Sequence, residues 1–235
     1  VPDTIDQFVE VVTEEQNLAR AMEVISAWYE KGSTLIFVDT QQAADMLFKS
    51  VISSGYACVT LHGGVEQVDR EAIIADFRRV HVKIMIATSV AARGLDVPSI
   101  RLVLNFDVPN HLQDYIHRVG RTGRAGNSGT AITFITPDEE QYSPDLIKTL
   151  KAAKQVIPSK LDELYQQFNA KLSQGTAKRH AGGYIKVSGF QFTKEEENHK
   201  RAARMRHWNM LSGENTDDIQ YDEASSSGES ADQEQ

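Results

Sequence analysis

The sequence of 235 residues holds one cysteine and six prolines, and it has no apolar run of the roughly 18 residues that a transmembrane helix needs. A lone cysteine excludes an internal disulfide and a zinc site built from several cysteines. We expect Cys58 to pack in a strand of a protein kept in a reducing compartment, so an intracellular location is predicted. The start of the chain has no signal-peptide pattern, and no membrane partner is expected. Because the chain begins with Val1 instead of methionine, we expect a fragment of a longer protein.

Lysine and arginine are absent from residues 207–235, where eight acidic residues lie. The remaining residues carry 25 charges of each sign, so the net charge of −8 belongs to this end of the chain. The acidity therefore does not argue against an anion-binding face on the folded part, where the local arrangement of charge decides. Serine, glycine and acidic residues dominate from Ser212 onward, and such a composition buries too little apolar area to fold, which predicts disorder.

Short apolar or alternating runs indicate strands, and segments with helical periodicity separate most of them. The predicted strands are Ile5–Val12, Thr34–Val38, Ala57–Leu61, Lys83–Ala87, Arg101–Phe106 and Thr130–Ile135. This alternation is typical of an α/β domain whose parallel sheet is covered by helices on both faces. Two further amphipathic helices are predicted at Asp138–Lys154 and Ser159–Leu172. We therefore expect a domain at 1–172, a linker with a helical extension at 173–211, and a disordered acidic tail at 212–235.

Residues that favour helix starts precede several of the predicted helices. Thr13 stands at such a position with Gln16 three residues later, as in a capping box. Thr40 and Asn110 are expected to cap the helices that follow them. Thr88 ends a buried strand and is expected to begin a short helix.

Ligands of open parallel sheets bind at the carboxyl ends of the strands. Polar or glycine residues follow four of the predicted strands at that edge, namely Thr40, Gly63 with Gly64, Thr88 and Asp107. Their convergence predicts a binding site at this edge of the sheet.

The eight residues from His117 to Arg124 contain three arginines and two glycines. Arg118, Arg121 and Arg124 recur every three residues, so a helical turn would place them along one side. Guanidinium groups match the geometry of phosphate oxygens, and the glycines allow the backbone to bend and to approach a ligand. The alternative reading of such a cluster is a solvated basic loop without a ligand.

This segment resembles motif VI of the DEAD-box RNA helicases. Thr88–Asp96 resembles motif V of the same family, and Thr34–Thr40 resembles motif IV, within a similarity that extends over about residues 5–155. The family members are ATPases made of two RecA-like domains that close on ATP and single-stranded RNA. The resemblance implies that this chain is the C-terminal RecA-like domain, with the N-terminal RecA-like domain as its partner.

For the ATP site, the resemblance implies that Arg124 is the arginine finger and that Arg121 also reaches the phosphates. It implies that His117, counted with Arg121 and Arg124 among the catalytic residues, couples the two domains together with Arg118. At the end of a helix, His117 could equally be a structural hydrogen-bonding residue. Gly94 would allow close approach of the nucleotide, and Asp96 would accept hydrogen bonds from the ribose. The chain contains neither a Gly-x-x-x-x-Gly-Lys-Thr motif nor an Asp-Glu-Ala-Asp motif, so Mg²⁺ and most of the ATP would be held by the other domain. No metal site is expected in the chain itself, and alone it should be a weak or inactive ATPase.

For RNA, the resemblance implies backbone contacts at the carboxyl edge of the sheet. The residues expected to make them are Thr40, Gly63, Gln67, Arg70 and Thr88. Helix capping alone would also explain the two threonines. The family usually has His-Gly-Asp where this chain has His-Gly-Gly at residues 62–64, so one local carboxylate is missing. Phe37 is expected to be a core residue or a support beneath an arginine.

Two other functions remain open from the sequence: a non-catalytic RNA- or protein-binding module with the same fold, and half of a DNA-directed helicase. Within the family, residues 62–64, 89–92 and 189–192 resemble the spliceosomal ATPase that helps the U2 particle engage the branch site. That resemblance implies a nuclear protein that works in pre-mRNA splicing beside spliceosomal proteins. We expect the chain to be a monomer.

Overall fold

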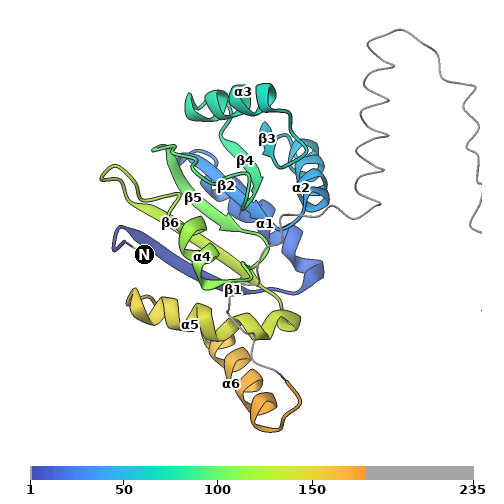
Figure 1. Cartoon of the computed structure of the whole chain (residues 1–235), viewed down its shortest axis with the longest axis vertical. Helices are drawn as coiled ribbons and strands as arrows, with labels where there is room; N and C mark the ends of the chain where they lie inside the picture. The colour runs from blue at the N-terminus through green and yellow to red at the C-terminus, as the bar shows by residue number, and fades with distance from the viewer. Residues whose placement is uncertain (1, 178–235) are drawn as a thin grey trace, which may run out of the picture. The chain divides into compact units, whose positions relative to one another are not determined.

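The computed structural model describes residues 2–177. The predicted acidic tail and nearly all of the predicted extension lie outside these residues. Within them, six strands form one sheet in the order β1-β6-β5-β2-β4-β3, and every pair of neighbours is parallel (Figure 1). The strands are β1 (Ile5–Val11), β2 (Ser33–Val38), β3 (Cys58–Leu61), β4 (Ile84–Thr88), β5 (Ile100–Asn105) and β6 (Gly129–Ile135). The predicted parallel α/β fold is confirmed.

The helices form two layers, one on each face of the sheet. They are α1 (Glu14–Trp28), α2 (Gln41–Ser53), α3 (Gln67–Arg78), α4 (Leu112–Val119), α5 (Ser143–Ala152) and α6 (Ser159–Ser173), with a 3₁₀ helix η1 (Pro137–Tyr142). The apolar side chains of α1 and α2 share one core cluster with one face of the sheet. Those of α3, α4, α5 and α6 share the other cluster. Along that second layer, α3 lies by β3 and β4, whereas α5 and α6 lie by β1 (Figure 1).

The helix caps are confirmed in part. Thr40 caps α2, and its hydroxyl accepts a hydrogen bond of 3.0 Å from the backbone N–H of Ala43. Thr13 occupies the cap position of α1, but its side chain makes no capping hydrogen bond. The cap of α4 is His111 and not Asn110, so that prediction is wrong by one residue.

Two predicted helices have a different form in the structure. After Thr88 the chain makes successive turns over residues 89–94 instead of a short helix. Gly94 has a φ of +74°, a value that ends a right-handed helix, and it limits the length available for one. The single helix predicted at Asp138–Lys154 is divided into η1 and α5, because Pro144 in the first turn of α5 lacks the N–H that a continuous helix would need there.

Candidate functional site

The arginine cluster straddles the end of α4. Only Arg118 lies within the helix, which ends at Gly120, while Arg121 and Arg124 follow it in a loop. The expected stacking of all three along one helical side is therefore wrong. Gly123 has a φ of +66°, and a Cβ atom there would lie 2.5 Å from Cγ1 of Ile5, so the loop requires glycine at this position.

A buried threonine hydroxyl and a close approach at a glycine fix this loop against the sheet. The hydroxyl of Thr122, which is 1% exposed, donates a hydrogen bond of 2.7 Å to the backbone oxygen of Ile100 at the start of β5. A Cβ atom on Gly129 would lie 2.2 Å from that same hydroxyl. Thr122 thus anchors the loop midway between Arg121 and Arg124. No sequence pattern points to Thr122, since a threonine between two arginines gives no sign of a partner 22 residues away.

Arg118 is directed into the domain, where it is 4% exposed. Its guanidinium donates to Oγ of Ser89 at 2.7 Å, to the backbone oxygen of Asp107 at 2.8 Å and to Oδ1 of Asp39 at 2.8 Å. It also lies over the ring of Phe37, 5.3 Å from its centroid, which confirms Phe37 as a support beneath an arginine.

These contacts join the ends of β2, β4 and β5 to α4. Because these donors are used within the domain, Arg118 holds the site together from inside, and its expected part in coupling the two domains stays a prediction.

Asp107 is the second carboxylate of this group. Its Oδ2 accepts a hydrogen bond of 2.8 Å from the backbone N–H of Asp39. Burial raises the pKa of Asp107 to about 6, and the neighbouring carboxylate of Asp39 acts in the same direction, while that hydrogen bond and Arg118 oppose the shift. The sequence placed Asp107 at the edge of the sheet but gave no sign of this interaction, since its partners are 68 and 11 residues away.

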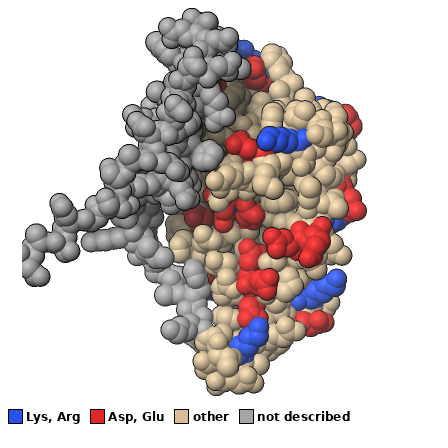
Figure 2. Space-filling model, turned by 90° about the vertical axis from the view of Figure 1, so that its right-hand side faces the viewer, with Lys and Arg blue, Asp and Glu red and all other residues tan. Residues whose placement is uncertain are grey.

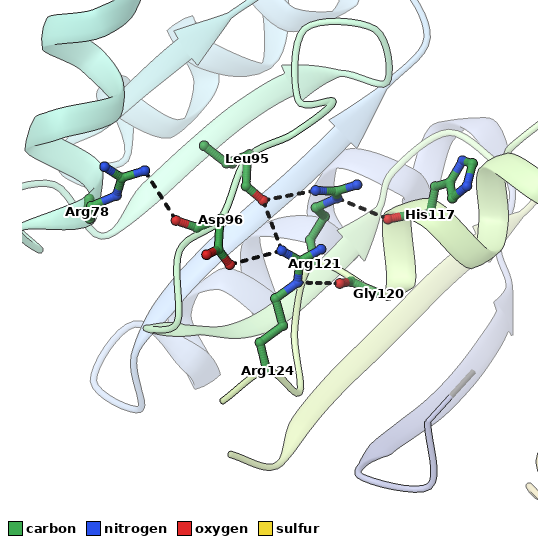
Figure 3. A network of polar contacts seen from close by, with 7 residues as sticks. All are labelled: Arg78, Leu95, Asp96, His117, Gly120, Arg121 and Arg124. Carbon is green, nitrogen blue, oxygen red and sulfur yellow. Dashed lines mark hydrogen bonds and ion pairs between the residues drawn. The ribbon is translucent and has the colours of Figure 1, made fainter. Parts of the chain in front are cut away.

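Arg121 and Arg124 converge on the loop that follows β4 (Figure 3). Nη1 of Arg121 donates to the backbone oxygen of Leu95 at 2.9 Å, and Nη1 of Arg124 lies 3.4 Å from the same oxygen. Arg124 also donates to Oδ1 of Asp96 at 3.0 Å and, through Nε, to the oxygen of Gly120 at 2.7 Å. The two predicted phosphate-binding arginines and the predicted ribose-binding carboxylate therefore lie together.

Positive charge exceeds negative charge at this site. Besides Arg121 and Arg124, Nη2 of Arg78 lies 3.3 Å from the backbone oxygen of Asp96, so three guanidinium groups contact a two-residue segment that carries one carboxylate. Partial burial lowers the pKa of Arg121, and the proximity of Arg124 lowers it further, against the effect of Asp96. A site with this charge and geometry is suited to an anion with several oxygens.

His117 has a different environment from the two arginines. Its backbone oxygen accepts a hydrogen bond of 3.2 Å from Nε of Arg121. Its side chain is exposed, and the imidazole points away from Arg121 and Arg124 (Figure 3). In this orientation, the imidazole ring of His117 is open to solvent on the side that faces away from Arg121 and Arg124.

Gly94 and Asp96 lie in the loop after β4 that also contains Leu95, whose backbone oxygen accepts from Arg121. Among the described residues, nothing lies within 4 Å of the point that a Cβ atom on Gly94 would occupy. The side chain of Asp96 is 71% exposed. A ligand can therefore approach both residues from outside the domain.

The candidate RNA residues lie at the ends of β2, β3 and β4 or at the start of α3. The hydroxyl of Thr40 is engaged as a helix cap, while the exposed amide of Gln67 donates to Glu71 at 3.2 Å. Arg70 donates to the backbone oxygen of Ala91 through Nη2, so part of its guanidinium is used within the domain. Because β3, β4 and β2 are consecutive in the sheet, Thr40, Gly63 and Thr88 lie along one continuous edge.

The other end of that edge is acidic. A depression of about 630 Å³ opens beside the carboxyl ends of β1, β5 and β6. Its acidic lining residues are Glu14, Glu15, Asp107, Asp138 and Glu139. In a view from the side, acidic side chains follow one another down the middle of the face, with few basic ones beside them (Figure 2). A nucleic-acid backbone is repelled by such a surface, which leaves the ends of β2, β3 and β4 as the side of the edge suited to RNA.

Two absences concern residues 2–177. None of their helices is long and apolar enough to cross a membrane. They also contain no cluster of three or more histidine, cysteine or acidic side chains arranged to hold a metal ion.

Comparison with known proteins identifies the family. Residues 16–126 match the model of the "Helicase conserved C-terminal domain". The solved structure of the C-terminal domain of the DEAD-box protein Dbp5 is similar to this chain with a TM-score of 0.51 and 35% identity, over 57% of this chain and 78% of that one. The chain belongs to the DEAD-box RNA helicase family. Its fold is that of the C-terminal RecA-like domain.

Two long relatives show the same similarity in sequence. "DEAD-box ATP-dependent RNA helicase 42" of Arabidopsis thaliana is 48% identical over 200 residues, which cover 85% of this chain and 17% of the relative. "Pre-mRNA-processing ATP-dependent RNA helicase prp5" of Sclerotinia sclerotiorum is 47% identical over 217 residues, covering 91% of this chain and 19% of the relative. The DEAD-box domain described here thus corresponds to less than a fifth of either protein.

Proposed function

We propose that this domain is the C-terminal half of an ATP-dependent RNA helicase and that it completes the ATP site of an N-terminal RecA-like domain. The observation that carries the proposal is the convergence of Arg121 and Arg124 on Leu95 and Asp96. This arrangement presents two planar cations and one carboxylate on adjacent segments, as a nucleotide with phosphates and a ribose requires.

The residues of this domain fit that nucleotide by charge and by access. Arg124 is the arginine finger: it stabilises the negative charge that develops on the γ-phosphate oxygens during phosphoryl transfer. Arg121 binds the phosphates beside it, and His117, whose ring is accessible, contacts the opposite domain. Gly94 admits the nucleotide, and Asp96 accepts hydrogen bonds from the ribose. Mg²⁺, bound by the N-terminal domain with ATP, would neutralise phosphate charge.

The RNA surface lies at the ends of β2, β3 and β4. Thr40, Gly63, Gln67, Arg70 and Thr88 bind the phosphates and sugars of single-stranded RNA in this proposal. Such contacts are made to the backbone and carry no base sequence information. The acidic depression at the ends of β1, β5 and β6 limits the RNA path to this side.

The biological setting follows from the relatives. The Sclerotinia sclerotiorum protein is named as a pre-mRNA-processing helicase, and on that basis we propose a nuclear role in splicing with spliceosomal partner proteins. Residues 1–172 would act as the RecA-like unit, with 173–211 as an extension and 212–235 as a tail. We propose that the protein acts as a monomer.

The test is the ATPase of the protein that contains this domain together with its N-terminal partner. Turnover should be stimulated by single-stranded RNA and much less by DNA, and Arg124→Ala should abolish most of it. Arg79→Ala is a matched control, because Arg79 is an exposed arginine outside the proposed site. Stimulation by DNA alone would favour a DNA helicase. RNA binding without any turnover would favour the alternative of a non-catalytic binding module.

A further inference from the structure

Helix α3 holds the loop after β4 at two points. Arg70, in the first turn of α3, donates to the backbone oxygen of Ala91. Arg78, the last residue of α3, lies with Nη2 3.3 Å from the backbone oxygen of Asp96. Between the two arginines, Phe77 is fully buried in the core below the helix. The helix and the loop therefore face each other over eight residues of α3, which is about 12 Å at 1.5 Å per residue.

The far end of the same loop carries the acceptors of the catalytic arginines. Arg121 donates to the backbone oxygen of Leu95, and Arg124 donates to the carboxylate of Asp96. Asp96 is thus bonded from two sides, with Arg78 on its carbonyl and Arg124 on its carboxylate (Figure 3). The contact of Arg78 with the backbone oxygen of Asp96 fixes the orientation of that peptide group. This orientation determines the position of the Asp96 side chain, which faces Arg124 and the proposed ribose site.

Arg78 itself is exposed, and its guanidinium donates to a backbone oxygen, that of Asp96. A backbone oxygen carries no net charge, so it does not compete with a phosphate for the guanidinium as a carboxylate would. The contact also lies at the opposite end of α3 from Gln67, so the length of the helix separates Arg78 from that proposed RNA residue.

We propose that Arg78 is a positioning residue for the ATP site. It holds the Leu95–Asp96 segment against α3, and it thereby places Asp96, Arg121 and Arg124 for reaction when RNA fixes the start of the same helix. The inference rests on the proposed function, since it requires those three residues to act on ATP. Arg78 touches neither nucleotide nor RNA, and its effect passes through the loop.

The experiment uses the full protein with its N-terminal domain and compares Arg78→Ala, Arg78→Lys and the control Arg79→Ala. RNA-stimulated kcat should fall about 3- to 10-fold in Arg78→Ala, in the range of coupling through residues that do not touch a ligand. The RNA concentration for half stimulation should stay within about twofold, because no RNA contact is lost. The preference for ATP over 2′,3′-dideoxy-ATP should narrow, because Asp96 is less well placed. Arg78→Lys should recover part of kcat, since an ammonium can donate one hydrogen bond to a carbonyl oxygen.

Three outcomes would overturn the inference. The first is that Arg78→Ala matches Arg79→Ala in every measurement. The second is that it changes only the RNA concentration for half stimulation, which would make Arg78 an RNA contact. A loss of kcat that follows a fall in Tm and is not recovered by lysine would make it a purely structural residue. Arg124→Ala, measured in parallel, separates this failure from a failure of the proposed function: its full turnover would reject the arginine finger, whereas its inactivity beside a silent Arg78→Ala would reject only the positioning role.

Discussion

Nη1 of Arg124 lies 3.0 Å from Oδ1 of Asp96, and the pair is partly open to solvent, with 31% and 71% of the two side chains exposed. Exposed ion pairs contribute about 0–1 kcal/mol to stability. Each partner is also a proposed ligand of ATP, so the pair has to separate or rearrange when a nucleotide is bound between the domains. These two proposed ligands of ATP are therefore joined to each other by a weak contact in the free domain.

Arg124→Ala should lower kcat by roughly 10³-fold or more, the scale of other arginine fingers, which corresponds to about 4 kcal/mol of barrier. Arg124→Lys should restore little, because an ammonium lacks the planar fork. Stability should fall only by about 1 kcal/mol, since the ion pair is exposed. RNA-stimulated ATPase and urea unfolding of both variants measure these effects. Full turnover in the alanine variant would reject the assignment, and a collapse of folding would make Arg124 a structural residue.

Arg118 should behave in the opposite way. Its side chain is 4% exposed and donates to the hydroxyl of Ser89, the backbone oxygen of Asp107 and the carboxylate of Asp39, so Arg118→Met leaves these acceptors without their donor. Because 35% of the Asp39 side chain is exposed, the loss should be smaller than the about 3–5 kcal/mol of a fully buried ion pair, on the order of 1–3 kcal/mol. The free energy of unfolding of the chain, measured in urea, should fall by that amount, whereas Arg79→Met should leave it nearly unchanged. A loss below about 1 kcal/mol would show that the network is not a source of stability.

Asp107 should make the stability depend on pH. Its pKa is raised from 3.8 to about 6 in the folded state, so the folded protein binds the proton more tightly than the unfolded chain. The stabilising contribution is complete below about pH 4 and is lost as the pH rises through about 6, with a total on the order of 2 kcal/mol. Asp107→Asn keeps an acceptor for the N–H of Asp39 and removes the titration. Its stability relative to the natural chain should therefore increase from pH 4 to pH 7 in urea unfolding, and parallel pH profiles would contradict the shift.

The sheet and most helices could be predicted because their signals are local. The apolar run of β2 is buried at every residue, and Thr40 caps α2 as its position indicates. The support of an arginine by Phe37 could be anticipated only through the family resemblance. Periodicity reaches only a few residues along the chain, and it located the strands and most helices, whereas the exact cap residues were predicted only in part.

The hydrogen bonds and ion pairs within the site could not be predicted, because they join segments that are distant in the sequence. The spacing alone does not distinguish Arg118, which is buried, from Arg121 and Arg124, since all three recur at the same interval. Their separation follows from the end of α4 at Gly120, which turns the later two toward Leu95. The role of Arg78 likewise depends on a contact 18 residues away in the sequence.

Binding to RNA should be nearly indifferent to base sequence and should weaken as salt increases, because the proposed contacts are made to the backbone. Arg70→Ala should weaken binding and reduce the log–log salt slope by about 0.7, the value for one phosphate charge on a single strand. Gln67→Ala should weaken binding without a change of slope, since a neutral amide displaces no counterion. Arg79→Ala should leave both quantities unchanged.

The measurement uses the protein with both RecA-like domains, a non-hydrolysable ATP analogue, and single-stranded RNAs of different base composition over a range of salt concentrations. An unchanged slope in Arg70→Ala would mean that its guanidinium serves Ala91 alone and that the residue is not a phosphate contact. A strong preference for one base sequence together with a flat response to salt would reject backbone recognition altogether. In that event the RNA would have to be read by groups other than the edge formed by β2, β3 and β4.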